Sequence, residues 1–302
     1  MDILTTQSNN SSLLENDSWN VAFYGEDVDN RGRESVRIST NSAEKHHKLT
    51  YCAENQSWSI DSQETESRHI LQLVHGQNSV LLDGTTLGVA EICKMLQLLI
   101  AKKVPRVSFL YIEPGDYTTS SEENSLQPSY CLSDNTIVSG LRGYVLDTSN
   151  KFEGAAVIFL GFEGDRPLVA LEQQNLDDVM KYYVIGIPAF KAGWEKRSII
   201  HNLPLISDSY NKGHTEVRYC EANSVFSAYK LLEELDRELK NLDQELIIGP
   251  FGTKPESIAA ALYLCRNPRR TGLIYDHPTR KHERSYDVGR FHLYDIRNIA
   301  ND

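Results

Sequence analysis

Several features that classify a protein quickly are scarce in this sequence. The five cysteines are scattered and none belongs to a C-x-x-C pair, which argues against a disulfide framework and against a cysteine-based zinc site. Apolar runs are far shorter than the roughly 20 residues that cross a bilayer, so we predict no membrane-spanning helix and no membrane partner. Because unpaired cysteines fit a reducing compartment, we expect a cytoplasmic protein.

Positive charge is also limited. The chain has 31 Lys and Arg against 42 Asp and Glu, a formal net charge of -11. The surface as a whole is therefore not expected to attract a nucleic-acid backbone or an anionic membrane. Arginine and histidine nevertheless gather between Arg266 and His292, so the sequence predicts one local cationic site suited to phosphate groups. The structural alternative is a solvated segment, held by salt bridges, that closes the sheet.

Three common catalytic or nucleotide-binding motifs are missing. Neither the P-loop G-x-x-x-x-G-K-[ST] nor the dinucleotide fingerprint G-x-G-x-x-G occurs, which disfavours an ordinary NTPase and a nicotinamide dehydrogenase. No G-x-S-x-G nucleophile elbow lies near the histidines. We therefore assign no catalytic residue and no metal ligand, and the cofactor is unknown.

Composition and hydrophobic pattern divide the chain into four expected parts. Residues 1–18, rich in Asn, Ser and Thr, are expected to form a disordered tail rather than a secretory signal. Residues 19–75 are expected to be β-rich, with short strand-like runs such as 36–39. We expect a first Rossmann-like unit at residues 76–150 and a second Rossmann-like region, ending in the cationic segment, at residues 151–302.

Three strand–loop–helix–strand repeats determine the predicted fold. They begin at the apolar runs 79–83, 155–160 and 245–248, each followed by a glycine-containing loop and a helical pattern. This alternation predicts an α/β protein with a Rossmann-like, mainly parallel sheet and helices on both faces. The first and third repeats resemble each other, so two pseudo-repeated halves and two unrelated units that obey the same rules both remain open.

The loops after the predicted strands are the expected ligand site. In open parallel sheets, ligands bind beyond the carboxyl ends of the strands, where helix N-termini offer unpaired amides and a partial positive charge. We expect the loops 84–86, 161–166 and 252–254 to meet at one rim of a single sheet. The structural alternative is that their glycines form turns and their threonines cap helices, and Thr253 with Glu256 does have capping-box spacing.

The candidate ligand-binding residues come from these loops, from the strand ends and from the cationic segment. They are Asp83, Gly84, Thr85, Thr86, Glu113, Glu163, Arg166, Gly252, Thr253, Lys254, His277, Arg280 and Arg284. Carboxylates at strand ends also suit acid–base or metal chemistry. Asp83, Glu113 and Asp276 with His277 are therefore the residues that an enzymatic alternative would use.

The loops at 82–88 (LDGTTLG) and 249–255 (GPFGTKP) resemble those of CRISPR-associated Rossmann fold (CARF) proteins and of their fused relative, the SAVED domain. In these families a strand enters a Gly/Thr/Lys loop that contacts a cyclic oligonucleotide. The resemblance covers roughly residues 79–295. It implies that the ligand contacts Thr85, Thr86, Gly252, Thr253 and Lys254. Pro250-Phe251 departs from the usual second glycine region, and no recognisable effector domain follows.

The leading hypothesis is a protein that binds or senses a nucleotide or another phosphorylated ligand. The resemblance implies, more narrowly, a cyclic-oligonucleotide sensor or a subunit of a bacterial antiviral defence system, with a separately encoded effector protein as its partner. The alternatives are a metal-dependent phosphoester or nucleotide hydrolase and a non-catalytic interaction subunit of a larger complex. Whether the chain is an enzyme and whether it forms homo-oligomers are open at this stage.

Overall fold

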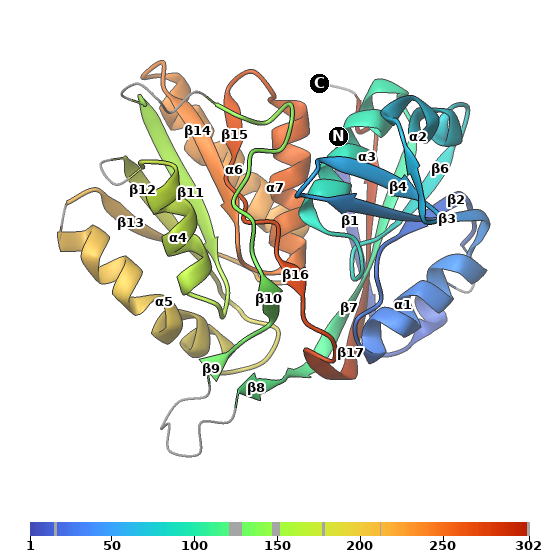
Figure 1. The fold of residues 1–302 in the computed structure, drawn as a ribbon, viewed down its shortest axis with the longest axis horizontal. Coiled ribbons are helices and arrows are strands. Elements are labelled where there is room, and N and C mark those ends of the chain that lie inside the picture. Colours follow the sequence, from blue (N-terminus) through green and yellow to red (C-terminus); the bar gives the residue numbers. More distant parts are fainter. Residues whose placement is uncertain (15–16, 121–128, 147–151, 177–178, 212, 301–302) are drawn as a thin grey trace. The chain divides into compact units, whose positions relative to one another are not determined.

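The fold was analysed in a computed structural model that describes residues 1–14, 17–120, 129–146, 152–176, 179–211 and 213–300 (Figure 1). The chain forms two compact units. Unit 1 consists of Met1–Asn135 with Pro278–Asp302, and unit 2 consists of Thr136–His277. This division differs from the expected boundaries at 75/76 and 150/151, because the end of the chain returns to the sheet formed by its beginning.

Unit 1 contains three α-helices among its described residues. They are α1 (Asn30–Asn41), α2 (Ser67–Val74) and α3 (Val89–Ala101), with a short 3-10 helix at Ser11–Leu14. The strands of its main sheet are β1 (Asp2–Ser8), β2 (Trp19–Tyr24), β3 (Ala43–Cys52), β4 (Ser57–Ile60), β5 (Gln63–Thr65), β6 (Ser79–Asp83), β7 (Arg106–Tyr117) and β17 (Ser285–Arg297). Two small ladders pair β8 (Thr119–Ser120) with β9 (Ser129–Tyr130) and β10 (Ser133–Asn135) with β16 (Thr279–Arg280).

The main sheet of unit 1 has the strand order β1-β17-β7-β6-β2-β3-β4-β5. Its centre, β7-β6-β2-β3, is parallel, whereas the outer strands are antiparallel. The side chains of Val80, Leu81 and Leu82 in β6 are fully buried. A continuous apolar run therefore did identify a central parallel strand, as the sequence predicted.

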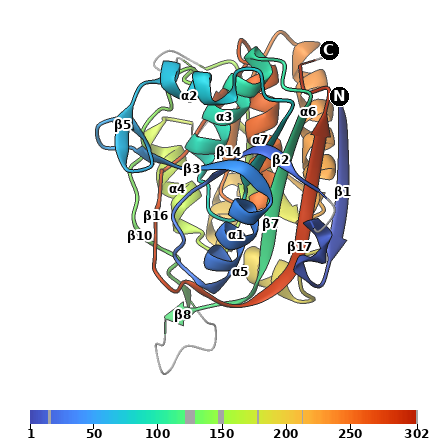
Figure 2. The same cartoon turned by 90° about the vertical axis from the view of Figure 1, so that its right-hand side faces the viewer.

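Two expectations for the N-terminal region are wrong. Residues 2–8 form strand β1, which pairs with β17 along its whole length, so they are not a disordered tail; residues 15–16 lie outside the described part (Figure 2). The partner strand comes from the other end of the chain, and no local pattern reveals it. The expected strand at 36–39 lies within helix α1, which begins where the Asp29 side chain accepts a hydrogen bond from Gly32 N.

Unit 2 is a parallel sheet between helices. Its strands are β11 (Gly154–Leu160), β12 (Met180–Gly186), β13 (Thr215–Cys220), β14 (Glu245–Pro250) and β15 (Thr271–Leu273), in the order β13-β12-β11-β14-β15. Its helices are α4 (Asp165–Gln173), α5 (Trp194–Asn211), α6 (Val225–Lys240) and α7 (Lys254–Arg266). The sheet lies between α4 and α5 on one face and α6 and α7 on the other (Figure 1).

The two units repeat one arrangement of parallel strands. In unit 1, β2 lies between β3 and β6, with β7 outside β6. In unit 2, β11 lies between β12 and β14, with β15 outside β14. Each unit therefore has its own topological switch point, between β2 and β6 or between β11 and β14. The α/β, Rossmann-like fold is confirmed, and the two units share this arrangement of parallel strands.

The expectation that the three loops follow strands of a single sheet is wrong. Asp83 ends a strand of the unit 1 sheet, whereas Gly161 and Gly252 follow strands of the unit 2 sheet. The apolar run at 79–83 pairs with β2 and β7, and not with the later repeats. The sequence therefore identified the strands correctly but assigned them to one sheet instead of two.

In the described residues, no helix has both the length and the apolar character needed to cross a bilayer.

Candidate functional site

The loops that follow β2 and β6 are in contact at the switch point of unit 1. Gly25 N donates a hydrogen bond to Thr86 Oγ1 at 2.9 Å. A Cβ atom at Gly25 would lie 2.3 Å from Thr86 O, which is closer than any side chain tolerates. Only glycine allows this approach, and the two loops together form the rim where open α/β sheets bind their ligands.

The Asp83 loop is closed by its own hydrogen bonds. Asp83 Oδ1 accepts from Ser35 Oγ at 2.6 Å and from Thr85 N at 2.9 Å, and Oδ2 accepts from Thr86 Oγ1 at 2.7 Å. Burial raises the pKa of Asp83, although these hydrogen bonds oppose the shift. Gly84 N donates to the carbonyl of Leu110 at 2.8 Å.

This bonding favours the structural interpretation of the loop. The side chains of Thr85 and Thr86 are buried, and the amides of residues 84–86 already have protein acceptors. Asp83, Gly84, Thr85 and Thr86 therefore shape the rim rather than offer donors to a ligand. The carbonyl oxygens of both threonines accept hydrogen bonds from Arg280, so the cationic segment is the other component of the site.

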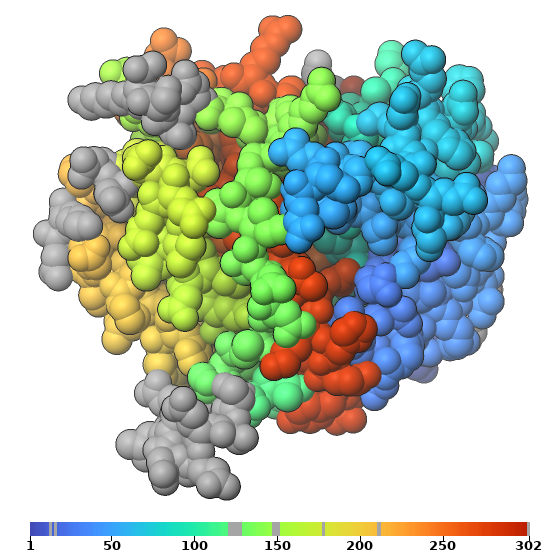
Figure 3. Space-filling view, in the orientation of Figure 1, coloured from blue at the N-terminus to red at the C-terminus, as the bar shows by residue number. Residues whose placement is uncertain are grey.

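The cationic segment is fixed against this rim at several points. Arg280 Nη1 donates to Thr85 O at 3.3 Å, and Nη2 donates to Thr86 O. Lys281 N donates to Leu132 O at 3.0 Å, and Glu283 N donates to Val28 O at 2.7 Å. The chain between β16 and β17, orange-red in Figure 3, lies at the protein surface, with residues 281–283 exposed.

Arg31, which sequence reasoning missed, is the buried part of the same site. Its Nε lies 3.1 Å from Ser285 Oγ and 3.3 Å from Asp29 Oδ2, and its Nη1 donates to Ile112 O at 3.1 Å. Burial alone would raise the pKa of Asp29, but Arg31 and the hydrogen bond from Ser285 hold it below its usual value. The only signal for Arg31 in the sequence was its place in the first turn of a helix that follows a buried strand.

Arg284 forms no ion pair among the described residues. Its Nε is buried and has no hydrogen-bond partner among the described residues, and no carboxylate in that part of the chain forms an ion pair with it. Burial, followed by repulsion from Arg280 and Arg31, lowers the pKa of Arg284 to about 10, although Tyr117 and Asp29 act in the opposite direction. We refer to Arg31, Arg280 and Arg284 as the arginine cluster.

The switch point of unit 2 has the same close approach but, in the part of the chain that the structure describes, no such cluster. A Cβ atom at Gly161 would lie 2.4 Å from Phe251 O. Thr253 caps α7 in the predicted capping box, accepting from Glu256 N while Thr253 N donates to Glu256 Oε2 at 2.5 Å. Thr253 Oγ1 also donates to Ala222 O at 2.6 Å. The polar groups of Thr253 are therefore occupied, as the structural alternative predicted.

Glu256 adds an unusual titratable group to this rim. Its side chain is fully buried, and the Cys220 thiol lies 3.6 Å from Oε1. Burial raises the pKa of Glu256 to about 7, in spite of the hydrogen bonds from Thr253. Gly252 packs against this carboxylate, and Lys254 is the partly buried first residue of α7.

The charges of Glu163 and Arg166 are balanced within unit 2. Arg166 makes two 2.7 Å hydrogen bonds to the two oxygens of Asp276 and a 3.2 Å hydrogen bond to Glu163. Burial opposes the charged form, but the Asp276 hydrogen bonds keep the pKa of Arg166 above its usual value. A ligand anion would have to compete with this bidentate pair, so unit 2 is the weaker candidate for anion binding.

The carboxylates of the enzymatic alternative are each bonded to a different group. Asp83 binds Ser35, Asp276 binds Arg166, and Glu113 lies 2.6 Å from His292 Nε2. His277 Nε2 lies 3.2 Å from the carbonyl of Ser139, and burial lowers its pKa. Among the described residues, no three His, Cys, Asp or Glu side chains are grouped to hold a metal ion.

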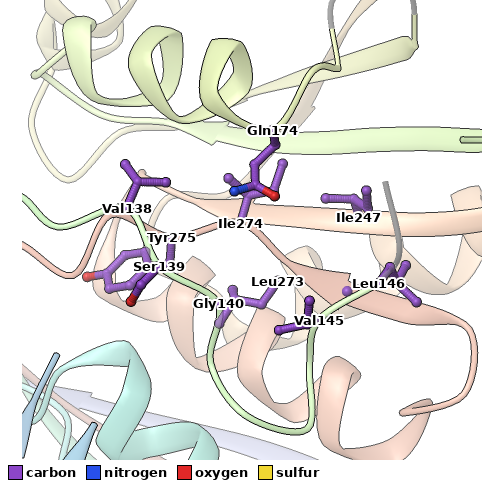
Figure 4. A pocket seen from close by; sticks show the side chains of 11 residues that line it. Val138, Ser139, Gly140, Val145, Leu146, Gln174, Ile247, Leu273, Ile274 and Tyr275 are labelled. Carbon is purple, nitrogen blue, oxygen red and sulfur yellow. The ribbon is translucent and has the colours of Figure 1, made fainter. Parts of the chain in front are cut away.

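A cavity in unit 2 lies beside β15 (Figure 4). It is lined by Val138, Ser139, Gly140, Val145, Leu146, Gln174, Ile247, Gly272, Leu273, Ile274 and Tyr275. Its volume of about 20 Å³ is enough for water but not for a nucleotide. None of the predicted ligand-binding residues lines it, so the arginine cluster is the stronger candidate site.

Comparison with known proteins adds little. No protein-family model matches the chain, and no curated protein matches it. Among solved structures, the chain is similar to an N-terminal ketoreductase from a macrolactin assembly line, with 11% sequence identity and a TM-score of 0.20. The alignment covers 82% of this chain and 64% of that chain, so this protein spans less than two thirds of the ketoreductase's length.

Proposed function

We propose that this protein binds a small anionic ligand of the nucleotide or phosphorylated-metabolite class at the arginine cluster of unit 1. The observation that carries the proposal is the partly buried Arg284, whose Nε has no hydrogen-bond partner and which forms no ion pair among the described residues, next to Arg280 and Arg31. Removing a charge from water without a partner costs several kcal/mol per ion, so such an arrangement favours the binding of an anion.

The chemistry of the cluster suits phosphate. A guanidinium group offers parallel N–H donors that match phosphate oxygens, and charge-assisted bonds of this kind are among the strongest in proteins. The Nε of Arg284 has no hydrogen-bond partner among the described residues, whereas Arg31 is bound to Ser285 and Ile112 and contributes mainly its charge and its hold on the segment. Arg280 fixes the segment to the Asp83 loop and stays close enough to repel Arg284.

Position supports the same function. The cluster adjoins the loops after β2 and β6, the switch point at which open α/β sheets bind ligands. Cyclic oligonucleotides belong among the ligands to be tested, because of the CARF and SAVED resemblance of residues 82–88. That narrower function, a sensor in antiviral defence, is supported by the resemblance alone.

The test is ligand binding with a matched pair of arginine variants. Inorganic phosphate, AMP, ATP and a cyclic oligoadenylate are titrated by calorimetry against the wild type, Arg284→Gln and Arg37→Gln. Arg37 is an exposed arginine of α1 that is paired with Glu34, so its replacement removes a charge without touching the cluster. Loss of hydrogen bonds to a charged group, about 1.5–3 kcal/mol, predicts a Kd that rises by about 10-fold or more for Arg284→Gln only.

Two outcomes would contradict the proposal. The first is that none of these anions binds the wild type. The second is that Arg284→Gln and Arg37→Gln lower the affinity equally, which would indicate general electrostatic attraction. A ligand present at about 100 times its Kd is also expected to add about 2.7 kcal/mol to the free energy of unfolding, and this gain should disappear in Arg284→Gln.

A further inference from the structure

The outer edge of β13 is the feature of unit 2 that the proposed function does not use. β13 is the last strand of the five-stranded sheet, and every backbone partner recorded for it in the described residues lies on β12 or on Ile187, which directly follows β12. Residues 215–220 (TEVRYC) contain no proline, glycine or bulge. Such edges present unpaired N–H and C=O groups, and proteins usually protect them or pair them.

The ladder with β12 determines which backbone groups of β13 face outward. Lys181 N donates to His214 O, and Ile187 N donates to Cys220 O. Because alternate residues of a parallel strand bond to the same neighbour, the even-numbered residues of β13 use their backbone toward β12. The N–H and C=O groups of Thr215, Val217 and Tyr219 therefore point away from the sheet.

Side chains of opposite charge lie on either side of Val217 at this edge. Glu216 and Arg218 lie on one face of the strand with an ion pair of 2.6 Å, and the Arg218 guanidinium lies 5.7 Å from the centre of the Tyr182 ring. On the other face, Val217 is half-buried and Tyr219 is 59% exposed. An exposed tyrosine next to an unpaired edge is typical of a contact surface.

We propose that β13 pairs antiparallel with β13 of a second copy of this chain, with the two-fold axis at Val217. In this register Val217 faces Val217 of the other copy, and Thr215 faces Tyr219. All three outward-facing residues then form hydrogen-bonded pairs, so no backbone group of the edge is left over. The two five-stranded sheets join into one continuous sheet with a self-complementary interface.

Charge selects this partner and this register. With the axis at Val217, Glu216 lies opposite Arg218 of the other copy in a non-hydrogen-bonded pair, where facing side chains come closest. Opposite charges stabilise such a pair, and like charges destabilise it. A parallel, in-register pair would place Glu216 against Glu216. The order Glu–Val–Arg therefore fits a second copy of the same strand.

Charge-reversal variants of the full-length chain test the proposal. Mass is measured by size-exclusion chromatography with light scattering at rising protein concentration. The wild type is expected to be a dimer, and Glu216→Arg alone or Arg218→Glu alone is expected to be monomeric, because like charges then face each other. An equimolar mixture of these two variants is expected to form a heterodimer, and the double variant is expected to dimerise again.

Glu233→Arg is the control, since it makes the same charge change on the surface of α6, where Glu233 pairs with Lys230. It is expected to leave the dimer intact. Circular dichroism checks that each variant is folded, and heterodimer formation from two monomeric variants is a readout that misfolding cannot produce. A monomeric wild type at all concentrations would overturn the proposal, as would single variants that dimerise like the wild type.

Discussion

At Arg284, ligand binding and stability place opposite demands on one side chain. The guanidinium group is repelled by Arg280 and Arg31 and has no protein partner for its Nε among the described residues. In the absence of ligand, this charge destabilises the fold. A site of this kind is expected to gain stability when its functional residue is replaced by an apolar one.

Arg284→Met is therefore expected to stabilise the ligand-free protein by about 1 kcal/mol or more, because methionine keeps much of the packing of the arginine stem without its charge. Urea denaturation with and without phosphate measures both effects. The same variant should lose the stabilisation that phosphate gives the wild type. A variant that is clearly less stable than the wild type would show that Arg284 serves the fold and not a ligand.

Glu256 predicts a pH dependence of stability. Burial raises its pKa from 4.5 to about 7, so the folded state favours the protonated carboxyl. Its contribution is fully present below pH 4.5 and is lost as the pH rises through about 7, a change on the order of 3 kcal/mol. Glu256→Gln keeps an acceptor for Thr253 N but cannot ionise. The free energy of unfolding is measured for both proteins from pH 5 to pH 8. As the pH rises, the wild type is expected to lose stability relative to the variant. A difference that stays constant with pH would contradict the raised pKa.

Sequence reasoning was partly successful at this scale. The capping box of Thr253 and Glu256 was visible, because capping depends on residues three apart in the chain. The clustering of arginines near the end of the chain was visible too. The charges that surround Arg284 were not visible, because Arg31 and Asp29 come from a segment far away in the sequence.

At the scale of elements, one glycine after β2 and one after β11 set the distance between neighbouring loops. Gly25→Ala and Gly161→Ala would each drive a Cβ atom into a backbone carbonyl, that of Thr86 or of Phe251. We expect each change to destabilise the protein by about 1–3 kcal/mol, the usual cost of overpacking. Thermal and urea unfolding measure the loss.

Gly76→Ala is the comparison variant. Gly76 has φ +76° and nothing within 4 Å of an added Cβ, so this change carries only the backbone cost of about 1 kcal/mol. If Gly25→Ala and Gly161→Ala cost no more than Gly76→Ala, the close loop contacts do not limit the fold. Gly25→Ala is also expected to weaken phosphate binding, since Arg280 is bonded to the loop that would move.

Elements with strong periodic patterns were predictable, and those defined by distant partners were not. The buried parallel strands β6, β11 and β14 appear as continuous apolar runs, since both of their faces are covered. β1 has mostly exposed polar side chains and exists because β17 bonds to it. Helix α1 has a weak apolar pattern, and the expected strand at 36–39 overlooked the cap at Asp29.

At the scale of the whole molecule, unit 2 is a single stretch of chain between the two parts of unit 1. Its apolar core draws on β11, β12, β14, α4 and α5, all within residues 136–277. Unit 1 depends on β17, which lies between β1 and β7 in its sheet. A single fragment, residues 136–277, therefore contains the whole of unit 2, whereas unit 1 needs both ends of the chain.

Residues 136–277 expressed alone are expected to fold cooperatively, with an α/β circular-dichroism spectrum and a single urea transition. Residues 1–135 alone are expected not to fold, because β1 and β7 lose the strand that joins them. The same unfolding measurement serves both fragments. A folded 1–135 fragment, or an unfolded 136–277 fragment, would show that the boundaries between the units are wrong.

The sequence by itself determined the α/β class, the repeated strand–loop–helix–strand order and the cationic character of the last segment, because these follow from local periodicity and composition. Only the tertiary structure decided that the repeats form two sheets, that β17 returns to the first of them, and that Arg31 joins Arg280 and Arg284. Strand pairing and charge balance depend on contacts between residues far apart in the chain, and a local pattern does not record its distant partner.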